Sequence, residues 1–134
     1  MRIAKGKTKF VYLPVTTSTV FTSGDAVAMS GGLVIEATSS TTPVLTIGLI
    51  RHSIASTDSN YATARLVEVE VPMEKGIIVE ATTASATASN IGIEYDLSDA
   101  RTVNLSGTSI KIFMPVTIVS STLVQGFMKF LGSY

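Results

Sequence analysis

The chain has 134 residues, no net charge, only 15% charged residues and a mean hydropathy of +0.43. This length indicates one domain, and the low charge argues against nucleic acid as the main partner, because phosphate binding needs a basic surplus. Cysteine is absent, which excludes disulfides and thiolate metal sites. No apolar run approaches the roughly 20 residues of a membrane helix, and the basic start lacks the apolar segment of a signal peptide. The hydropathy therefore suggests that apolar surface is buried against other chains.

Strand-forming residues dominate the whole chain and occur in short runs separated by turn residues. The first half predicts strands at residues 9–13, 25–29, 33–38, 44–50 and 66–71. Gly31 and Gly32 lie between two of these strands and predict a tight hairpin, in which at least one glycine has a positive φ. Valine and glutamate alternate in residues 66–71, so Glu68 and Glu70 should share an exposed face while the valines point inward.

The second half predicts strands at residues 77–82, 93–97, 102–105, 110–118 and 126–130. Residues 53–64 are too polar and β-branched for more than one or two turns of helix. Short strands with regular turn signals are typical of an all-β fold, here a small barrel or sandwich of antiparallel strands with little or no helix. The Ala/Ser/Thr-rich stretch 82–90 is interpreted as an exposed loop within one domain, residues 1–134. The alternative is a linker between two modules, residues 9–82 and 91–134.

The charged residues are segregated along the chain. The basic residues of the N-terminal segment are Arg2, Lys5, Lys7 and Lys9. Acidic residues gather in the middle and include Glu68, Glu70, Glu74 and Glu80. Residues 1–8 lack apolar periodicity, so we expect a flexible basic arm that complements an acidic body between subunits. The alternative is a frayed, solvated terminus.

The residues that carry chemistry in other proteins form no catalytic or metal-binding pattern here. His52 is the single histidine, and the adjacent Ser53 does not by itself supply a catalytic triad. Asp96 and Asp99 lack the glycine-turned, oxygen-rich loop of a calcium site, so a turn or cap role is favoured. Tryptophan is absent, which disfavours an aromatic platform for sugars or single strands. We therefore expect no enzyme activity, no cofactor, no metal and no small-molecule substrate.

Two segments of the chain resemble a known family. The first reads SGDAVAMSGGLVIEATSSTTPVLTIGLI and is followed, after a polar loop, by VEVEVPMEKGIIVEA. Its short strand, glycine-rich hairpin, proline-ended loop and alternating strand resemble the capsid decoration (cement) proteins of tailed bacteriophages, the lambda head-decoration group. The second segment, ASNIGIEYDLSDARTVNLS, resembles a part of the larger relatives. Together they cover most of residues 21–106.

The resemblance implies a β-tulip-like fold and a structural role without enzyme activity. Such proteins bind the outer surface of the expanded capsid, often as trimers, and brace neighbouring shell subunits. The implied partners are the major capsid protein and further copies of the chain, with neither nucleic acid nor membrane. The implied location is the virion, after synthesis in the host cytoplasm, and either the basic arm or the body would contact the shell. The alternatives are another phage structural β-protein, such as a tail, head-completion or fibre-associated module, and a carbohydrate- or surface-binding β-sandwich.

Overall fold

The computed structural model describes residues 1–43 and 45–131 of the chain. In these residues eleven β-strands and one short 3-10 helix are present, which confirms the all-β prediction. Each predicted strand overlaps an observed one, and Val44, the first residue of the predicted strand 44–50, lies outside the described residues. The N-terminal strand, residues 2–5, is the one strand that was not predicted.

The strands divide into two larger sheets and a small hairpin. The four-stranded sheet contains β1 (Arg2–Lys5), β7 (Ile78–Thr82), β10 (Phe113–Ser120) and β11 (Leu123–Met128). The five-stranded sheet contains β2 (Thr8–Pro14), β3 (Ala26–Ser30), β4 (Leu33–Glu36), β5 (Thr46–Ile50) and β6 (Leu66–Pro72). The hairpin contains β8 (Asp96–Leu97) and β9 (Val103–Asn104), and the 3-10 helix η1 (Ala88–Asn90) precedes it.

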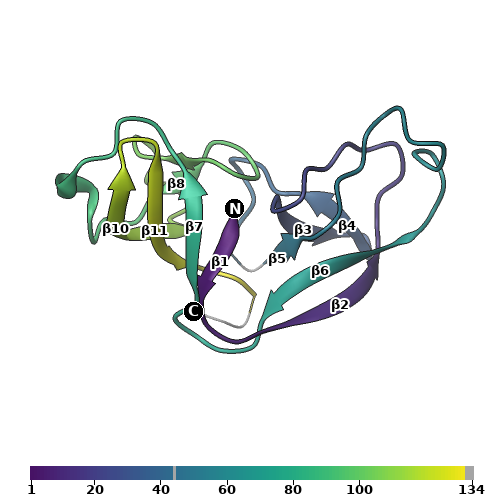
Figure 1. Ribbon diagram of the computed structural model, residues 1–134, viewed down its shortest axis with the longest axis horizontal. Coiled ribbons are helices and arrows are strands. Elements are labelled where there is room, and N and C mark those ends of the chain that lie inside the picture. The colour runs from purple at the N-terminus through teal and green to yellow at the C-terminus, as the bar shows by residue number, and fades with distance from the viewer. Residues whose placement is uncertain (44, 132–134) are drawn as a thin grey trace.

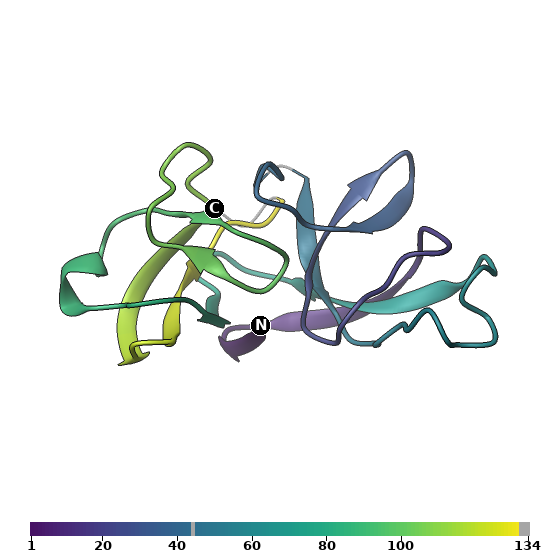
Figure 2. The ribbon, with the colours of Figure 1, turned by 90° about the horizontal axis from the view of Figure 1, so that it is seen from above.

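The strand orders are β1-β7-β11-β10 and β2-β6-β5-β3-β4, with antiparallel pairing throughout. Figure 1 shows the two sheets as neighbouring lobes, and Figure 2 shows the N-terminal segment passing from β1 in one lobe to β2 in the other. The five-stranded sheet curls until Val15, just beyond β2, forms a single bridge with Val34 on β4. Of the two predicted architectures, the sandwich fits and the closed barrel does not.

The buried apolar residues form two clusters. One contains the inner face of the four-stranded sheet and the β8–β9 hairpin, together with Ala26, Ala37 and Leu49 from the five-stranded side. The other lies inside the curl of the five-stranded sheet. Leu49 and Ile50 are neighbours on β5 but belong to different clusters, because successive side chains of a strand point to opposite faces. The five-stranded sheet is therefore buried on both faces near β5, and the first cluster joins the two sheets.

The alternative division into residues 9–82 and 91–134 does not follow the sheets. β7 ends at Thr82 but pairs with β11 and with β1, so the four-stranded sheet unites the middle of the chain with both of its ends. The stretch 82–90 is also anchored, since Thr83 and Ala86 are buried and Thr83 Oγ1 donates a hydrogen bond of 2.9 Å to the Val103 carbonyl. Pairing between distant strands leaves no mark in a local sequence pattern, so the sequence alone left both interpretations open.

The predicted glycine hairpin is confirmed. Gly31 and Gly32 connect β3 to β4, with Ser30 opposite Leu33, and their φ angles are 57° and 80°. Positive φ at both central residues is typical of the tight turn that suits the twist of two antiparallel strands. A Cβ added at either glycine would meet no atom within 4 Å, so backbone conformation alone requires glycine here.

Gly32→Val is therefore expected to lower the free energy of unfolding by more than about 1 kcal/mol, because a β-branched residue is strained at positive φ. Thermal unfolding of the purified variant measures the loss. Gly32→Asn is the matched control, since asparagine tolerates the left-handed region and should retain most of the stability. Identical melting temperatures for the valine variant and the parent would contradict the turn assignment.

Candidate interaction surface

The N-terminal segment is folded, which corrects the predicted flexible arm. β1 pairs with β7 at the edge of the four-stranded sheet, and the chain then turns at Gly6 into β2. Ile3 packs against the cluster that joins the sheets. A four-residue strand with one inward side chain is too short to show an alternating pattern, so its partner strand, and not its own sequence, holds it in place.

Arg2 finds its acidic partner within the same chain. Arg2 on β1 and Glu80 on β7 are register partners, and the guanidinium donates from Nε at 2.7 Å and from Nη2 at 3.0 Å to the carboxylate. Gln125 Nε2 donates a third hydrogen bond to this carboxylate, at 2.9 Å. The hydrogen bonds from Arg2 and Gln125 lower the pKa of Glu80. The predicted complementarity of basic segment and acidic body is thus met in cis at this position.

Glu68 and Glu70 face polar side chains of β2. Thr8 Oγ1 donates to Glu70 at 2.8 Å, and the Tyr12 hydroxyl donates to Glu68 at 3.1 Å, which raises the pKa of Tyr12. Arg51 Nη1 lies 3.3 Å from Glu70 Oε2. The two acids share one face of β6, as predicted, but the Glu70 side chain is only 12% exposed because Thr8 and Arg51 lie against it. Glu70 is therefore less exposed than the prediction of a shared exposed face requires.

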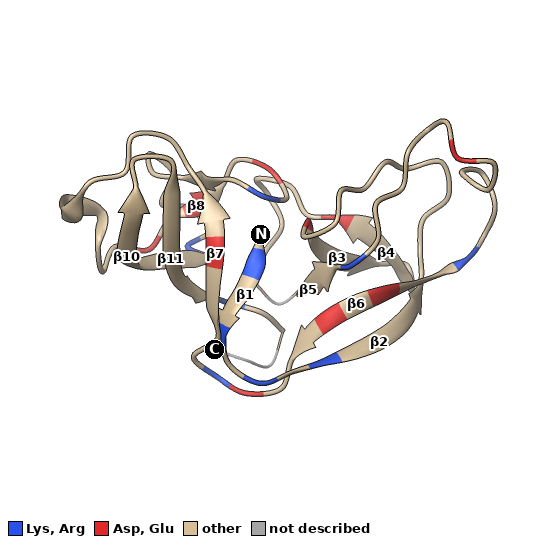
Figure 3. Ribbon diagram, viewed as in Figure 1, with Lys and Arg blue, Asp and Glu red and all other residues tan. Residues whose placement is uncertain are grey.

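The three lysines of the N-terminal segment differ from Arg2. Neither they nor Lys75 in the β6–β7 turn take part in an ion pair within the described part of the chain. Figure 3 shows these cations gathered along the edge where the β1–β2 turn meets the β6–β7 turn, with one acid among them. We call this surface the lysine tip, and its residues are Lys5, Lys7, Lys9 and Lys75.

Hydrogen bonds tie the two turns of the lysine tip together. The Met73 N–H donates to the Lys7 carbonyl at 2.9 Å, and the Lys7 N–H donates to the Glu74 carboxylate, also at 2.9 Å. Gly6 has a φ of 121°, and a Cβ at this position would collide with the Ile77 side chain. The two turns therefore pack closely against each other, and the backbone that carries the lysines is ordered. Glu74, one of the predicted acidic residues, accepts one of these hydrogen bonds and so helps to hold the two turns together.

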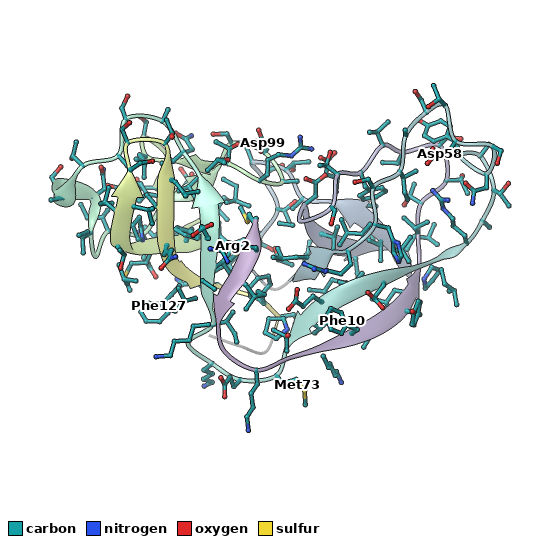
Figure 4. The ribbon with its side chains drawn as sticks, in the orientation of Figure 1. Arg2, Phe10, Asp58, Met73, Asp99 and Phe127 are labelled. Atoms are coloured by element: carbon teal, nitrogen blue, oxygen red, sulfur yellow. The ribbon has the colours of Figure 1, made fainter. Side chains whose placement is uncertain are left out.

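Large apolar side chains lie exposed beside the lysine tip. Phe10 on β2 is 54% exposed, Met73 in the β6–β7 turn is 60% exposed, and Phe127 on β11 is 37% exposed. Figure 4 shows all three along the same edge of the molecule. Exposed apolar groups bordered by charged residues are typical of protein interaction surfaces.

An ion pair that sequence reasoning missed joins the β8–β9 hairpin to the five-stranded sheet. Asp25, buried just before β3, accepts hydrogen bonds from Arg101 Nε at 2.8 Å and Nη2 at 3.1 Å. Glu36 lies 3.4 Å from the same guanidinium, and burial together with the nearby Asp25 charge raises the pKa of Glu36. No local signal marks this pair, because its two members are 76 residues apart.

Of the residues considered as catalytic or metal-binding candidates, Ser53, Asp96 and Asp99 form hydrogen bonds within the fold. Asp99 accepts the Arg101 N–H at 2.9 Å, which is the favoured turn role. Asp96 instead lies on β8 and accepts three backbone N–H groups from the distant residues 109–111. Ser53 Oγ accepts the Ser23 N–H at 2.9 Å, and His52 is an exposed loop residue. Among the described residues, no three His, Cys, Asp or Glu side chains are grouped so as to hold a metal ion.

A scan against protein-family models finds no match to this chain, and a search of curated proteins finds none either. In the described ranges, 1–43 and 45–131, no helix has the length and apolar character needed to cross a membrane. The lysine tip and its exposed apolar neighbours therefore form the candidate interaction surface.

Proposed function

We propose that the protein is a structural component of a bacteriophage virion that binds the outer surface of the capsid, as a trimer, and braces neighbouring shell subunits. The observation that carries the proposal is the lysine tip, where four cations that form no ion pair with residues 1–43 or 45–131 lie beside three exposed apolar side chains. The resemblance of residues 21–106 to capsid decoration proteins supports the choice of partner.

The ordered backbone of the lysine tip suits a protein that braces neighbouring shell subunits. Antiparallel strands of both sheets lead into its two turns, and the Met73–Lys7 hydrogen bond joins these turns. A contact surface that is already ordered loses little conformational entropy on binding. On a symmetric shell, each modest contact raises the effective concentration for the next, so repetition turns weak contacts into a durable assembly.

Lys7→Glu is expected to lower the occupancy of the protein on capsids about fivefold at low salt, because an exposed ionic contact contributes up to about 1 kcal/mol. The loss should shrink in high salt, since the Debye length is about 8 Å at physiological ionic strength and shorter above it. Co-pelleting with capsids stripped of this protein measures occupancy. Light scattering over a dilution series of the parent measures the oligomeric state, for which a trimer is expected.

Ser56→Glu is the control, because it also adds a negative charge, on an exposed residue outside the lysine tip. It should leave occupancy nearly unchanged. Equal occupancy of both variants and the parent at every salt concentration would contradict the role of the lysine tip. Failure of the parent to bind would contradict the capsid function itself. Deleting residues 1–8 is not a clean test, because it removes β1 from its pairing with β7.

A further inference from the structure

The outer face of the four-stranded sheet carries an apolar row that ends at the lysine tip. Ile78, Phe127 and Met114 are register partners across β7, β11 and β10. Directly opposite residues of antiparallel strands share one face, so these three side chains lie side by side. Lys5 on β1 is the register partner of Ile78 and extends the row to the edge of the sheet. The row therefore consists of one cation, Lys5, followed by three apolar side chains.

A surface hollow of about 290 Å³ lies over the β10–β11 part of this row. Its apolar lining comes from Met114, Phe127 and Met128, and its charged lining comes from Lys75, Glu94 and Lys129. Lys129 and Glu94 form an ion pair with each other. Lys75 has no ion pair within the described residues, so one charge at this hollow lacks a counter-ion from the fold.

We propose that this hollow receives a large apolar side chain of a partner protein, and that acidic residues flanking this side chain pair with Lys75 and Lys5. The volume is at the small end for a ligand pocket and suits one anchoring side chain. Such anchors, seated in a pocket with charges at its border, carry most of the affinity in many interfaces. The excess of lysine selects an acidic segment over a basic one. The inference rests on the proposed function only for the identity of the partner, a capsid subunit.

The chain's own methionines allow the hollow to be tested without capsids. Met114 and Met128 line it, whereas Met29 packs against the separate cluster of the five-stranded sheet. In a protein with ¹³C-labelled methionine methyl groups, the capped peptide Asp-Glu-Phe-Glu-Asp should shift the Met114 methyl resonance saturably and leave that of Met29 in place. Peptides with lysine for the acids, or with alanine for the phenylalanine, should shift it less.

Lys75→Glu should weaken binding of the acidic peptide about fivefold. Ser56→Glu is the control, because it also adds a negative charge, on an exposed residue of the β5–β6 loop outside both the hollow and the lysine tip, and it should alter binding less than about twofold. The inference is overturned if the Met114 resonance does not move, if the three peptides act alike, or if the two variants weaken binding equally. A Met114 shift that depends on protein concentration without peptide would assign the hollow to a second copy of the chain, and would also overturn it.

Capsid co-pelleting separates this inference from the proposed function. If the parent binds capsids but the acidic peptide does not reach the hollow, the inference fails and the proposed function stands. If the peptide binds as expected but capsids are not bound, the hollow is a peptide site and the proposed function fails.

Discussion

Val69→Asp is expected to abolish folding. Val69 on β6 is fully buried in the cluster inside the curled five-stranded sheet, and the residues of that cluster are apolar. A carboxylate placed there would lose its hydration without gaining a cation or a hydrogen-bond donor from the cluster. This costs several kcal/mol, which is comparable to the whole stability of a small domain, about 5–15 kcal/mol. Circular dichroism of the purified variant should show the loss of the native sheet signal and of the cooperative melting transition.

Glu68→Gln tests the same strand on its opposite face. The glutamine carbonyl oxygen still accepts the hydrogen bond that the Tyr12 hydroxyl donates to Glu68, so the free energy of unfolding should change by less than about 0.5 kcal/mol. Urea unfolding measures this difference. Comparable losses from the two substitutions would mean that β6 does not alternate between a buried and a polar face.

Asp96→Ala is expected to destabilise the protein by roughly 2–3 kcal/mol. The carboxylate of Asp96 on β8 is buried and accepts N–H groups from Ser109 at 3.0 Å, Ile110 at 2.7 Å and Lys111 at 2.8 Å. Hydrogen bonds to a charged acceptor contribute about 1.5–3 kcal/mol, and alanine leaves these three donors without their acceptor. Asp99→Ala removes an acceptor of one N–H group in an exposed turn and should cost less than about 1 kcal/mol.

The contribution of Asp96 should also depend on pH. Burial opposes the charged carboxylate, but the three backbone N–H groups outweigh it and lower the pKa of Asp96 below its ordinary value of 3.8. A lowered pKa in the folded state means that the stabilisation is fully present above the ordinary pKa and is lost as the pH falls through the folded value. The stability gap between the parent and Asp96→Ala should therefore be constant above about pH 5 and shrink below about pH 4. Urea unfolding across this range measures the gap, and a constant gap down to about pH 2 would contradict the role of the charge.

The sequence by itself determined the features that depend on neighbours along the chain. Alternation with a period of two located β6 and the direction of its valines, since successive side chains of a strand point to opposite faces. Gly31 and Gly32 marked a turn because positive φ is nearly free of strain only for glycine. Asp99 was assigned to a turn, and the hydrogen bond that it accepts from the N–H of Arg101, two residues further along the chain, confirms this.

Only the tertiary structure decided which strands pair, and therefore what each surface contains. β1 is folded because β7 offers it a partner, and its Arg2 is neutralised by Glu80 from the opposite strand. The apolar row beside the lysine tip takes one residue from each of three strands, so the register between those strands creates it. Strand pairing and register are set by contacts between residues far apart in the chain, whose free energy depends on burial and on cross-strand neighbours. Local sequence patterns do not contain that information. The sequence therefore predicted where the strands lie, and only the fold showed which side chains share the candidate interaction surface.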